Sequence, residues 1–143
     1  MSATIREIVL KKIKTLLYEQ VEVDSLTIPF YSGYFGNAEY GIYVLSYREE
    51  EDDNKHKFAS LVTVELGIFG QDKTVDFVAE ITRNVRQIIK ASIDSTIQLS
   101  DGYEATITTI PMLSTYTELI DGKTTYRDVL QVGLRVDEFS DNS

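Results

Sequence analysis

The sequence predicts an α+β fold, in which two α-helices pack on one face of a mainly antiparallel β-sheet that closes with a long C-terminal β-hairpin. Two segments, residues 4–18 and 74–92, carry apolar residues at helical spacing. Three others, residues 40–47, 58–69 and 103–136, are rich in the β-branched and aromatic residues of strands. Strands that follow one another in sequence most often pair antiparallel, so we predict the order helix, edge strand, hairpin, helix, long hairpin.

The first helix is predicted over residues 4–18. Thr4 and Glu7 have capping-box spacing, in which Thr4 accepts a hydrogen bond from the Glu7 amide. Lys11, Lys12 and Lys14 follow in the second half, where the helix dipole favours cations. The predicted buried stripe is Ile5, Ile8, Val9, Ile13, Leu16 and Leu17.

A brief edge strand is predicted within residues 26–31, because Pro29 has no amide hydrogen to give to a neighbouring strand. Residues 40–47 are apolar or aromatic on both alternating faces, so this strand either lies between layers or presents Tyr43 and Tyr47 to a partner. The run of residues 48–57, REEEDDNKHK, contains five consecutive acidic residues and predicts a solvated, mobile loop between two paired strands. A calcium site is the alternative, but the alternating ligands and central glycine of an EF-hand loop are missing.

The second helix is predicted over residues 74–92, with Asp72 or Thr74 as its N-cap. Arg83, Arg86 and Lys90 lie late in the helix, where they either bind an anion or form a solvated outer face. The predicted buried stripe is Val75, Val78, Ile81, Val85, Ile88 and Ile89.

The C-terminal hairpin is centred on Asp121-Gly122. An Asp-Gly pair between strand-like runs favours a type I′ turn, whose two central residues need positive φ. A two-residue turn fixes the register. We therefore predict that Leu119 pairs with Thr124, Thr117 with Tyr126, Thr115 with Asp128 and Leu113 with Leu130. One face then carries Leu113, Leu119, Tyr126, Leu130, Val132, Leu134 and Val136, and the other Ser114, Tyr116, Glu118, Thr125, Arg127, Gln131 and Arg135. The tip is predicted to extend beyond the core and to meet another molecule.

Size and charge limit the possible functions. The chain of 143 residues fits one domain, with residues 138–143 as a polar tail. Its net charge of −9 repels phosphate, which argues against wrapping nucleic acid but suits a wall past which DNA slides, as well as simple solubility. There is no cysteine, no signal peptide pattern and no apolar run long enough to span a bilayer, so we expect a soluble, intracellular protein without membrane contact.

Catalytic motifs are absent from the sequence. His56 is the only histidine and falls in the charged run, which argues against both a nucleophile–base pair and a zinc site. Glu104, Glu118, Asp121 and Asp128 all have plain strand or turn interpretations, although Asp128 interrupts an apolar face. We predict no enzyme activity, no catalytic residues, no bound metal and no cofactor.

The element order resembles that of the tail-terminator or tail-completion (minor tail) proteins of long-tailed bacteriophages. The resemblance covers Thr4 to about Glu138 and rests on a helix, a short strand into a Pro-aromatic segment, and three further stretches. These are KFASLVTVELGIFG, TVDFVAEITRNVRQIIKAS and the closing TTYRDVLQVGLRV with its arginine before the last strand. The acidic run and the extended hairpin tip depart from the family pattern.

The resemblance implies a virion protein that forms a ring, usually a hexamer, at the head-proximal end of the tail. Such a ring, assembled in the host cytoplasm, caps the tail tube protein and docks the neck or head-completion proteins. By this analogy Tyr116, Glu118 and Arg127 contact a neighbouring subunit. Glu49, Glu50, Glu51, Asp52 and Asp53 face passing DNA without sequence-specific binding.

Two other functions fit the sequence. A small intracellular ligand-binding or adaptor domain would use the apolar underside of the sheet as a pocket. A hydrolase would have to work with carboxylates alone.

Overall fold

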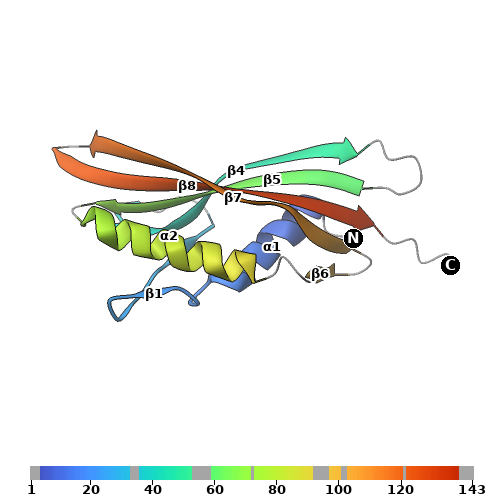
Figure 1. The fold of residues 1–143 in the computed structure, drawn as a ribbon, viewed down its shortest axis with the longest axis horizontal. Helices are drawn as coiled ribbons and strands as arrows, with labels where there is room; N and C mark the ends of the chain where they lie inside the picture. The colour runs from blue at the N-terminus through green and yellow to red at the C-terminus, as the bar shows by residue number, and fades with distance from the viewer. Residues whose placement is uncertain are drawn as a thin grey trace.

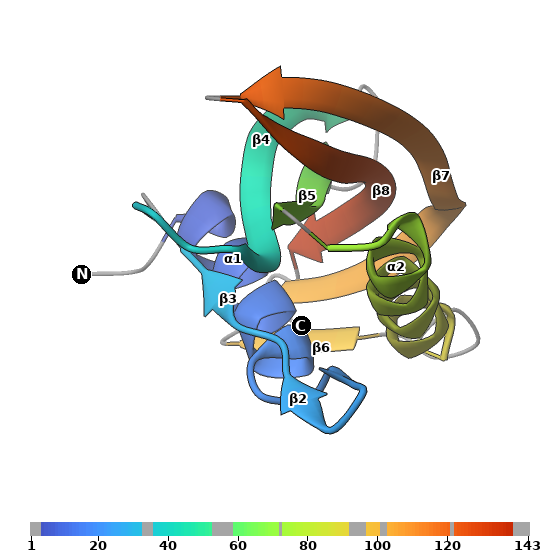
Figure 2. The same ribbon diagram turned by 90° about the vertical axis from the view of Figure 1, so that its left-hand side faces the viewer.

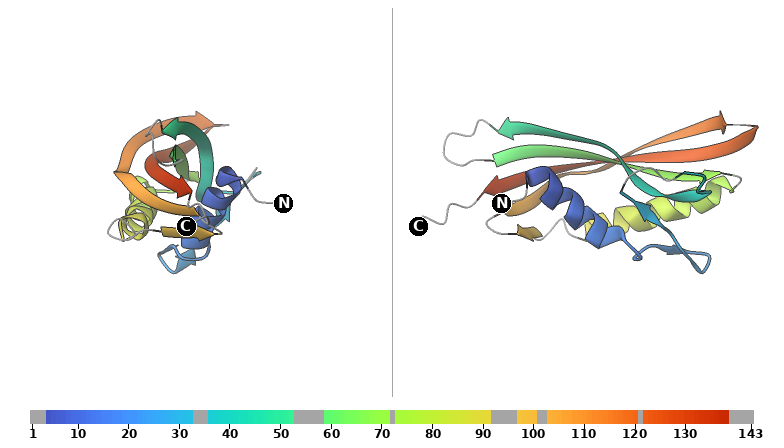
Figure 3. Two further views of the ribbon diagram at one scale, coloured as in Figure 1. Left: turned by 90° about the vertical axis from the view of Figure 1, so that its right-hand side faces the viewer. Right: turned by 180° about the vertical axis from the view of Figure 1, so that it is seen from behind.

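The computed structural model describes residues 4–32, 36–52, 59–71, 73–91, 97–100, 103–120 and 122–138. Helices α1 (Ile5–Leu17) and α2 (Val75–Lys90) lie on the same face of a six-stranded sheet, as Figure 1 and the rear view in Figure 3 show. The sheet order is β3-β4-β5-β8-β7-β6, and every pair except β3–β4 is antiparallel. The strands are β1 (Glu22–Val23), β2 (Leu26–Thr27), β3 (Phe30–Tyr31), β4 (Tyr40–Asp52), β5 (Ala59–Gln71), β6 (Ile97–Ser100), β7 (Tyr103–Ile120) and β8 (Lys123–Glu138). The predicted α+β fold is confirmed.

The core lies between the helices and the concave side of a strongly curved sheet, which Figure 2 shows end-on. Alternate residues of the two central strands β5 and β8 face the helices, as expected for strands with one buried face. The main contributors are Val62, Val64, Leu66 and Ile68 of β5, Leu130, Val132, Leu134 and Val136 of β8, Val9, Ile13 and Leu17 of α1, and Val78, Ile81, Val85 and Ile89 of α2.

Both helices begin where the sequence predicts. The Thr4 hydroxyl accepts from the Glu7 amide at 3.2 Å, and the Thr74 hydroxyl accepts from the Phe77 amide at 3.1 Å. The predicted burial of Val75 is wrong, because this side chain is 49% exposed. The face of α2 that meets the sheet is rotated toward Phe77 and Thr82, which are both buried.

The C-terminal hairpin has the predicted register, and all four predicted cross-strand pairs are present. Gly122 has a φ of 76°, as the turn requires, while Asp121 lies outside the described residues. The register is irregular between Thr109 and Met112, around Pro111, within a strand that otherwise continues.

Residues 22–31 form three short strands, where only one brief edge strand was predicted. Strands β1 and β2 form a separate two-stranded hairpin, which turns at Asp24 and Ser25 with φ of 52° and 66°. Only β3 joins the main sheet, at its edge and parallel to β4. Pro29 precedes it, and its carbonyl accepts from the Ile42 amide at 2.9 Å. The edge position predicted from Pro29 is therefore correct.

Residues 48–52 of the acidic run form a strand, so the prediction of a mobile loop is wrong for this part of the run. These residues continue β4 and pair with residues 59–63 of β5. The alternation of a strand sends successive carboxylates to opposite faces, which keeps like charges apart. Arg48 and Glu50 also form an ion pair at 3.6 Å. Asp53 and the rest of the run, up to Lys57, lie outside the described residues.

A β-bulge at Leu45 changes which side chains of β4 face the helices. Val44 pairs with Leu66, but Ser46 already pairs with Glu65, so one extra residue is inserted between them. Tyr43 therefore lies on the face away from the helices, whereas Tyr47 packs against the core on the helix side. The alternative in which Tyr43 and Tyr47 together face a partner is therefore wrong, because simple alternation does not allow for the inserted residue.

Neither helix in the described part of the chain has the length and apolar character needed to cross a lipid bilayer.

Candidate functional site

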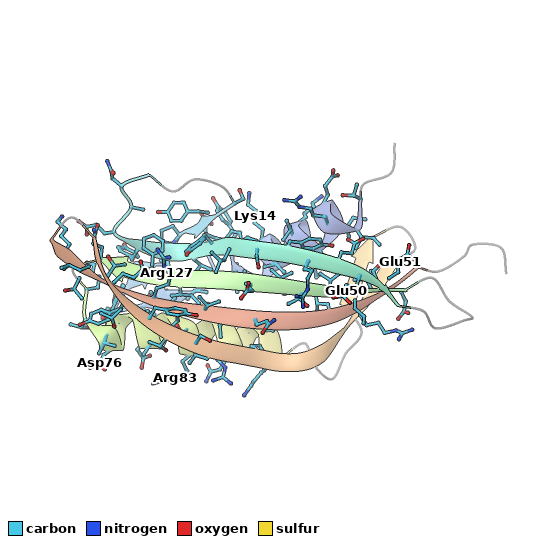
Figure 4. The ribbon with its side chains drawn as sticks, turned by 90° about the horizontal axis from the view of Figure 1, so that it is seen from above. Lys14, Glu50, Glu51, Asp76, Arg83 and Arg127 are labelled. Carbon is cyan, nitrogen blue, oxygen red and sulfur yellow. The ribbon has the colours of Figure 1, made fainter. Side chains whose placement is uncertain are left out.

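The three residues predicted at a subunit contact come together on the sheet face that points away from the helices. Tyr116 of β7 lies directly across from Arg127 of β8. Arg127 Nη1 lies 3.7 Å from Glu118 Oε1, so the two side chains form an ion pair within the chain. Figure 4 looks onto this face, with Arg127 toward the end where the hairpin turns. We call Tyr43, Tyr116, Glu118 and Arg127 the outer cluster.

Tyr43 of β4 completes this cluster, and the register of the C-terminal hairpin does not predict its place there. It pairs with Gly67, and a β-carbon at Gly67 would lie 2.3 Å from the Tyr43 ring, so the ring lies flat across the glycine. The Arg127 guanidinium carbon is 5.8 Å from the centre of the same ring, within cation–π range. A glycine in the middle of a β-strand is the signal that could have predicted a side chain crossing it.

Burial affects the pKa of Tyr43 and the hydrogen bonding of Arg127 in the outer cluster. Desolvation raises the pKa of the Tyr43 phenol, the Arg127 charge opposes this shift and Glu118 adds to it. The Arg127 side chain is only 23% exposed, and its Nε finds no hydrogen-bond partner within the described part of the chain. A buried donor without a hydrogen-bond partner costs free energy, so this Nε is an unsatisfied group within the outer cluster.

The acidic end of β4 lies at the opposite end of the long axis from the hairpin turn, as Figures 1 and 4 show. Glu49 pairs with Val62 and Glu51 with Ser60, which places both on the helix side of the sheet. Glu50 pairs with Leu61 and points to the outer face. Tyr47 donates to Glu49 Oε1 at 2.5 Å. The predicted acidic set therefore divides between the two faces, with the Asp53 side chain outside the described residues.

A basic groove runs between α2 and the helix side of the β7–β8 hairpin. Its volume is about 410 Å³. Its cationic lining comes from Arg83, Arg86 and Lys90, the residues for which an anion site was one interpretation. Arg83 pairs with Glu80 at 2.6 Å, whereas Arg86 and Lys90 have no ion pair with any described residue. The hairpin contributes Leu113, Thr115, Tyr126 and Asp128.

Asp128, the residue that interrupts an apolar face, forms a tie between two elements. It is 5% exposed and accepts a hydrogen bond from the Thr82 hydroxyl of α2 at 2.5 Å. The prediction that it pairs with Thr115 is correct. Its polar partner is Thr82, in the second helix of its own chain.

A second groove, of about 370 Å³, lies between α1 and β3–β4. Arg6, Lys11 and Lys14 line it, and Arg6 lies over the Tyr47 ring at 5.8 Å. Both helices thus place basic side chains beside the sheet of a protein whose net charge is −9.

The described residues contain no group of three or more His, Cys, Asp or Glu side chains placed to hold a metal ion. His56 lies outside them. The chain matches no protein-family model and no curated protein. The arrangement as a whole is suited to contact between surfaces: an arginine–tyrosine cluster, an acidic strand end and a basic groove.

Proposed function

We propose that this protein is a structural subunit of a long-tailed bacteriophage that forms a ring at the head-proximal end of the tail. There it caps the tail tube and joins it to the neck or head-completion proteins. The main support is the β7–β8 hairpin, whose end exposes apolar side chains on both faces. Leu113 is 46%, Tyr116 51% and Leu119 75% exposed. Apolar side chains grouped on an extended hairpin are typical of a protein–protein contact.

The difference between the two ends of the molecule supports a ring. The hairpin end carries exposed leucine and tyrosine, and the other end carries Glu49, Glu50 and Glu51. Unlike surfaces of this kind join copies head to tail, and such an association closes into a ring when its rotation allows. In this proposal the hairpin around Tyr116, Glu118 and Arg127 contacts the neighbouring subunit.

The charge of the protein supports a passage for DNA through the ring. A net charge of −9 repels the phosphate backbone, so DNA would pass without adhering. The hexameric state comes from the resemblance to tail-terminator proteins. Recognition of neighbours, without a reactive centre or cofactor, is then the whole mechanism.

Size-exclusion chromatography with light scattering, followed by negative-stain electron microscopy, tests this proposal. We expect a discrete ring whose population grows with protein concentration or on addition of the tail tube protein of the same phage. A chain that stays monomeric at high concentration, both alone and with that tube protein, would contradict the proposal.

The basic groove favours one alternative, a small adaptor or ligand-binding domain. Its lining combines apolar residues with Arg86 and Lys90, a composition that suits an acidic ligand. The same chromatography separates the two functions, because an adaptor would remain monomeric and bind an acidic peptide with one-to-one stoichiometry.

A further inference from the structure

We infer that the free edge of β7 accepts the acidic free edge of β4 from a second copy of this chain, so that the sheet continues from subunit to subunit. This inference rests on the self-assembly in the proposed function and names the surfaces that meet. It also gives a role to the basic groove, which the proposed function leaves without one.

On each side of the main sheet a short outer strand covers only part of the long strand beside it, so most of that long strand's edge has no strand partner among the described elements. Strand β3 pairs only with Ile42 and Tyr43, so residues 44–52 of β4 are open on that side. Strand β6 pairs only with residues 103–105 of β7, so residues 106–120 of β7 are open on the side away from β8. An open edge presents unpaired amide and carbonyl groups, which are a template for adding another strand.

One part of the open edge of β7 lacks the usual protection against pairing. Residues 113–117 are exposed and read LSTYT, with no charge and high β-propensity. The part before them carries such protection, because it contains Pro111 and the irregular register between Thr109 and Met112. Edge strands that must stay alone usually carry lysine, proline or a bulge that blocks a neighbour. A stretch of five exposed, uncharged residues at an edge is instead suited to receive a strand.

The directions of the strands allow the two open edges to meet. β4, β5, β8 and β7 alternate in direction, so β4 and β7 run antiparallel. A second copy placed beside β7 in the same orientation therefore presents an antiparallel β4. The acidic residues 49–51 of the β4 edge and the uncharged residues 113–117 of the β7 edge lie toward opposite ends of the long axis (Figure 1), so the copies must be staggered along the strands to bring them together. The contact joins two different edges of the sheet, so it is head to tail.

Charge complementarity identifies which faces meet. Glu49 and Glu51 lie on the helix side of β4, and the basic groove lies on the helix side of β7. In a continuous sheet these carboxylates approach Arg86 and Lys90, which have no ion pair with any described residue. The Arg86 Nε is buried and finds no hydrogen-bond partner in that part of the chain either. In this arrangement Glu50, on the outer face, is the glutamate of this set that stays available to face DNA.

Matched charge reversals test the inference. Glu51→Lys and Glu50→Lys make the same change in net charge on neighbouring residues that point to opposite faces. We expect Glu51→Lys to raise the protein concentration needed for assembly about tenfold, the effect of losing one charge-assisted contact, while Glu50→Lys leaves it within about twofold. Arg86→Glu should weaken assembly as Glu51→Lys does. Mixing these two variants should restore it, because the reversed charges again complement each other.

Cysteine cross-linking tests the strand contact directly, since the chain has no native cysteine. A Glu51→Cys variant is mixed with Leu113→Cys, Thr115→Cys or Thr117→Cys, which share the helix-side face of β7 and cover neighbouring registers. We expect a disulfide-linked dimer with one of the three. The control, Glu50→Cys with the same three partners, should give none, because its side chain lies on the other face.

The outcomes separate this inference from the proposed ring. If Glu51→Lys forms rings normally, and the Glu51→Cys variant gives no cross-link with any of its three partners, the inference is overturned and the proposed function stands. Cross-linked chains that grow only into open filaments would support the strand contact and contradict the ring. An unassembled wild-type chain that gives no cross-link but binds an acidic peptide in the groove would overturn both.

Discussion

At the scale of single residues, Arg127 holds the outer cluster together. It contacts Glu118 across the hairpin and lies over Tyr43, but its side chain is partly exposed. We expect Arg127→Glu to lower the free energy of unfolding by about 1 kcal/mol, the upper range for such an ion pair, and to prevent ring formation. Denaturant unfolding and light scattering measure the two effects separately.

The charge swap Arg127→Glu with Glu118→Arg is the control for this variant. It restores the ion pair within the chain, so it should recover stability. If the swap also recovers assembly, Arg127 acts only through the fold. If Arg127→Glu alone assembles as the wild type does, the contact assigned to the outer cluster is wrong.

The raised pKa of the Tyr47 phenol leads us to predict that the protein loses stability at alkaline pH. Burial raises the pKa of this phenol well above the ordinary 10.0, and the hydrogen bond to Glu49 raises it further. A pKa that is higher in the folded state gives stability that is fully present below the ordinary pKa and is lost as the pH rises toward the folded pKa. We therefore expect the free energy of unfolding to decline above about pH 10, and Tyr47→Phe to reduce that decline. If phenolate absorbance shows every tyrosine titrating near 10.0 in the folded protein, Tyr47 is not shielded.

Gly67 leaves no room for a side chain, so replacing it should lower the stability of the protein. Because a β-carbon there would lie 2.3 Å from the Tyr43 ring, Gly67→Ala must displace that ring. We expect a loss of about 1–3 kcal/mol in unfolding free energy, as for other overpacked sites. In a Tyr43→Ala background the same substitution should cost much less, which a double-mutant cycle by urea denaturation would measure.

At the scale of elements, the Thr82–Asp128 hydrogen bond ties α2 to β8. Thr82→Val keeps the shape of the side chain but leaves a buried carboxylate without its partner. We expect a loss of about 1–3 kcal/mol in unfolding free energy. Replacing Asp128 by Leu in the same chain should recover part of it, because no buried group is then unmatched. Equal stability of Thr82→Val and the wild type would show that the hydrogen bond contributes nothing.

The elements that the sequence predicts well are those with a strong local signal. The Asp-Gly turn alone specifies the register of the C-terminal hairpin, and the threonine caps specify both helix starts. The extension of β4 through Glu51 was not predictable in this way. Its acidic composition disfavours a strand locally, and pairing with β5, a tertiary contact, overrides that preference.

The candidate site was predictable only in part, for the same reason. Tyr116, Glu118 and Arg127 follow from the hairpin register, so their proximity could be predicted from sequence. Tyr43 joins them through Gly67 of a different strand, and the basic groove needs α2 to pack beside β7. Contacts between elements distant in sequence depend on how the sheet is ordered, which local patterns do not specify.

At the scale of the whole molecule, the separation of acidic and basic surfaces predicts that assembly depends on salt. Raising the ionic strength from about 0.1 M to 1 M shortens the Debye length from ~10 Å to ~3 Å. We expect the ring to dissociate more readily at the higher salt, as measured by light scattering across a salt series. Stronger assembly at high salt would show instead that exposed apolar residues such as Leu119 dominate the contact.

The bulge at Leu45 has a further consequence for comparing this chain with distant relatives. Odd-numbered side chains of β4 point outward before it and inward after it, so the strand reverses its parity at one residue. A sequence comparison that places its gap elsewhere in the strand would exchange the inward and outward glutamates. It would then assign the carboxylates that we propose meet a neighbouring subunit to the wrong side of the sheet.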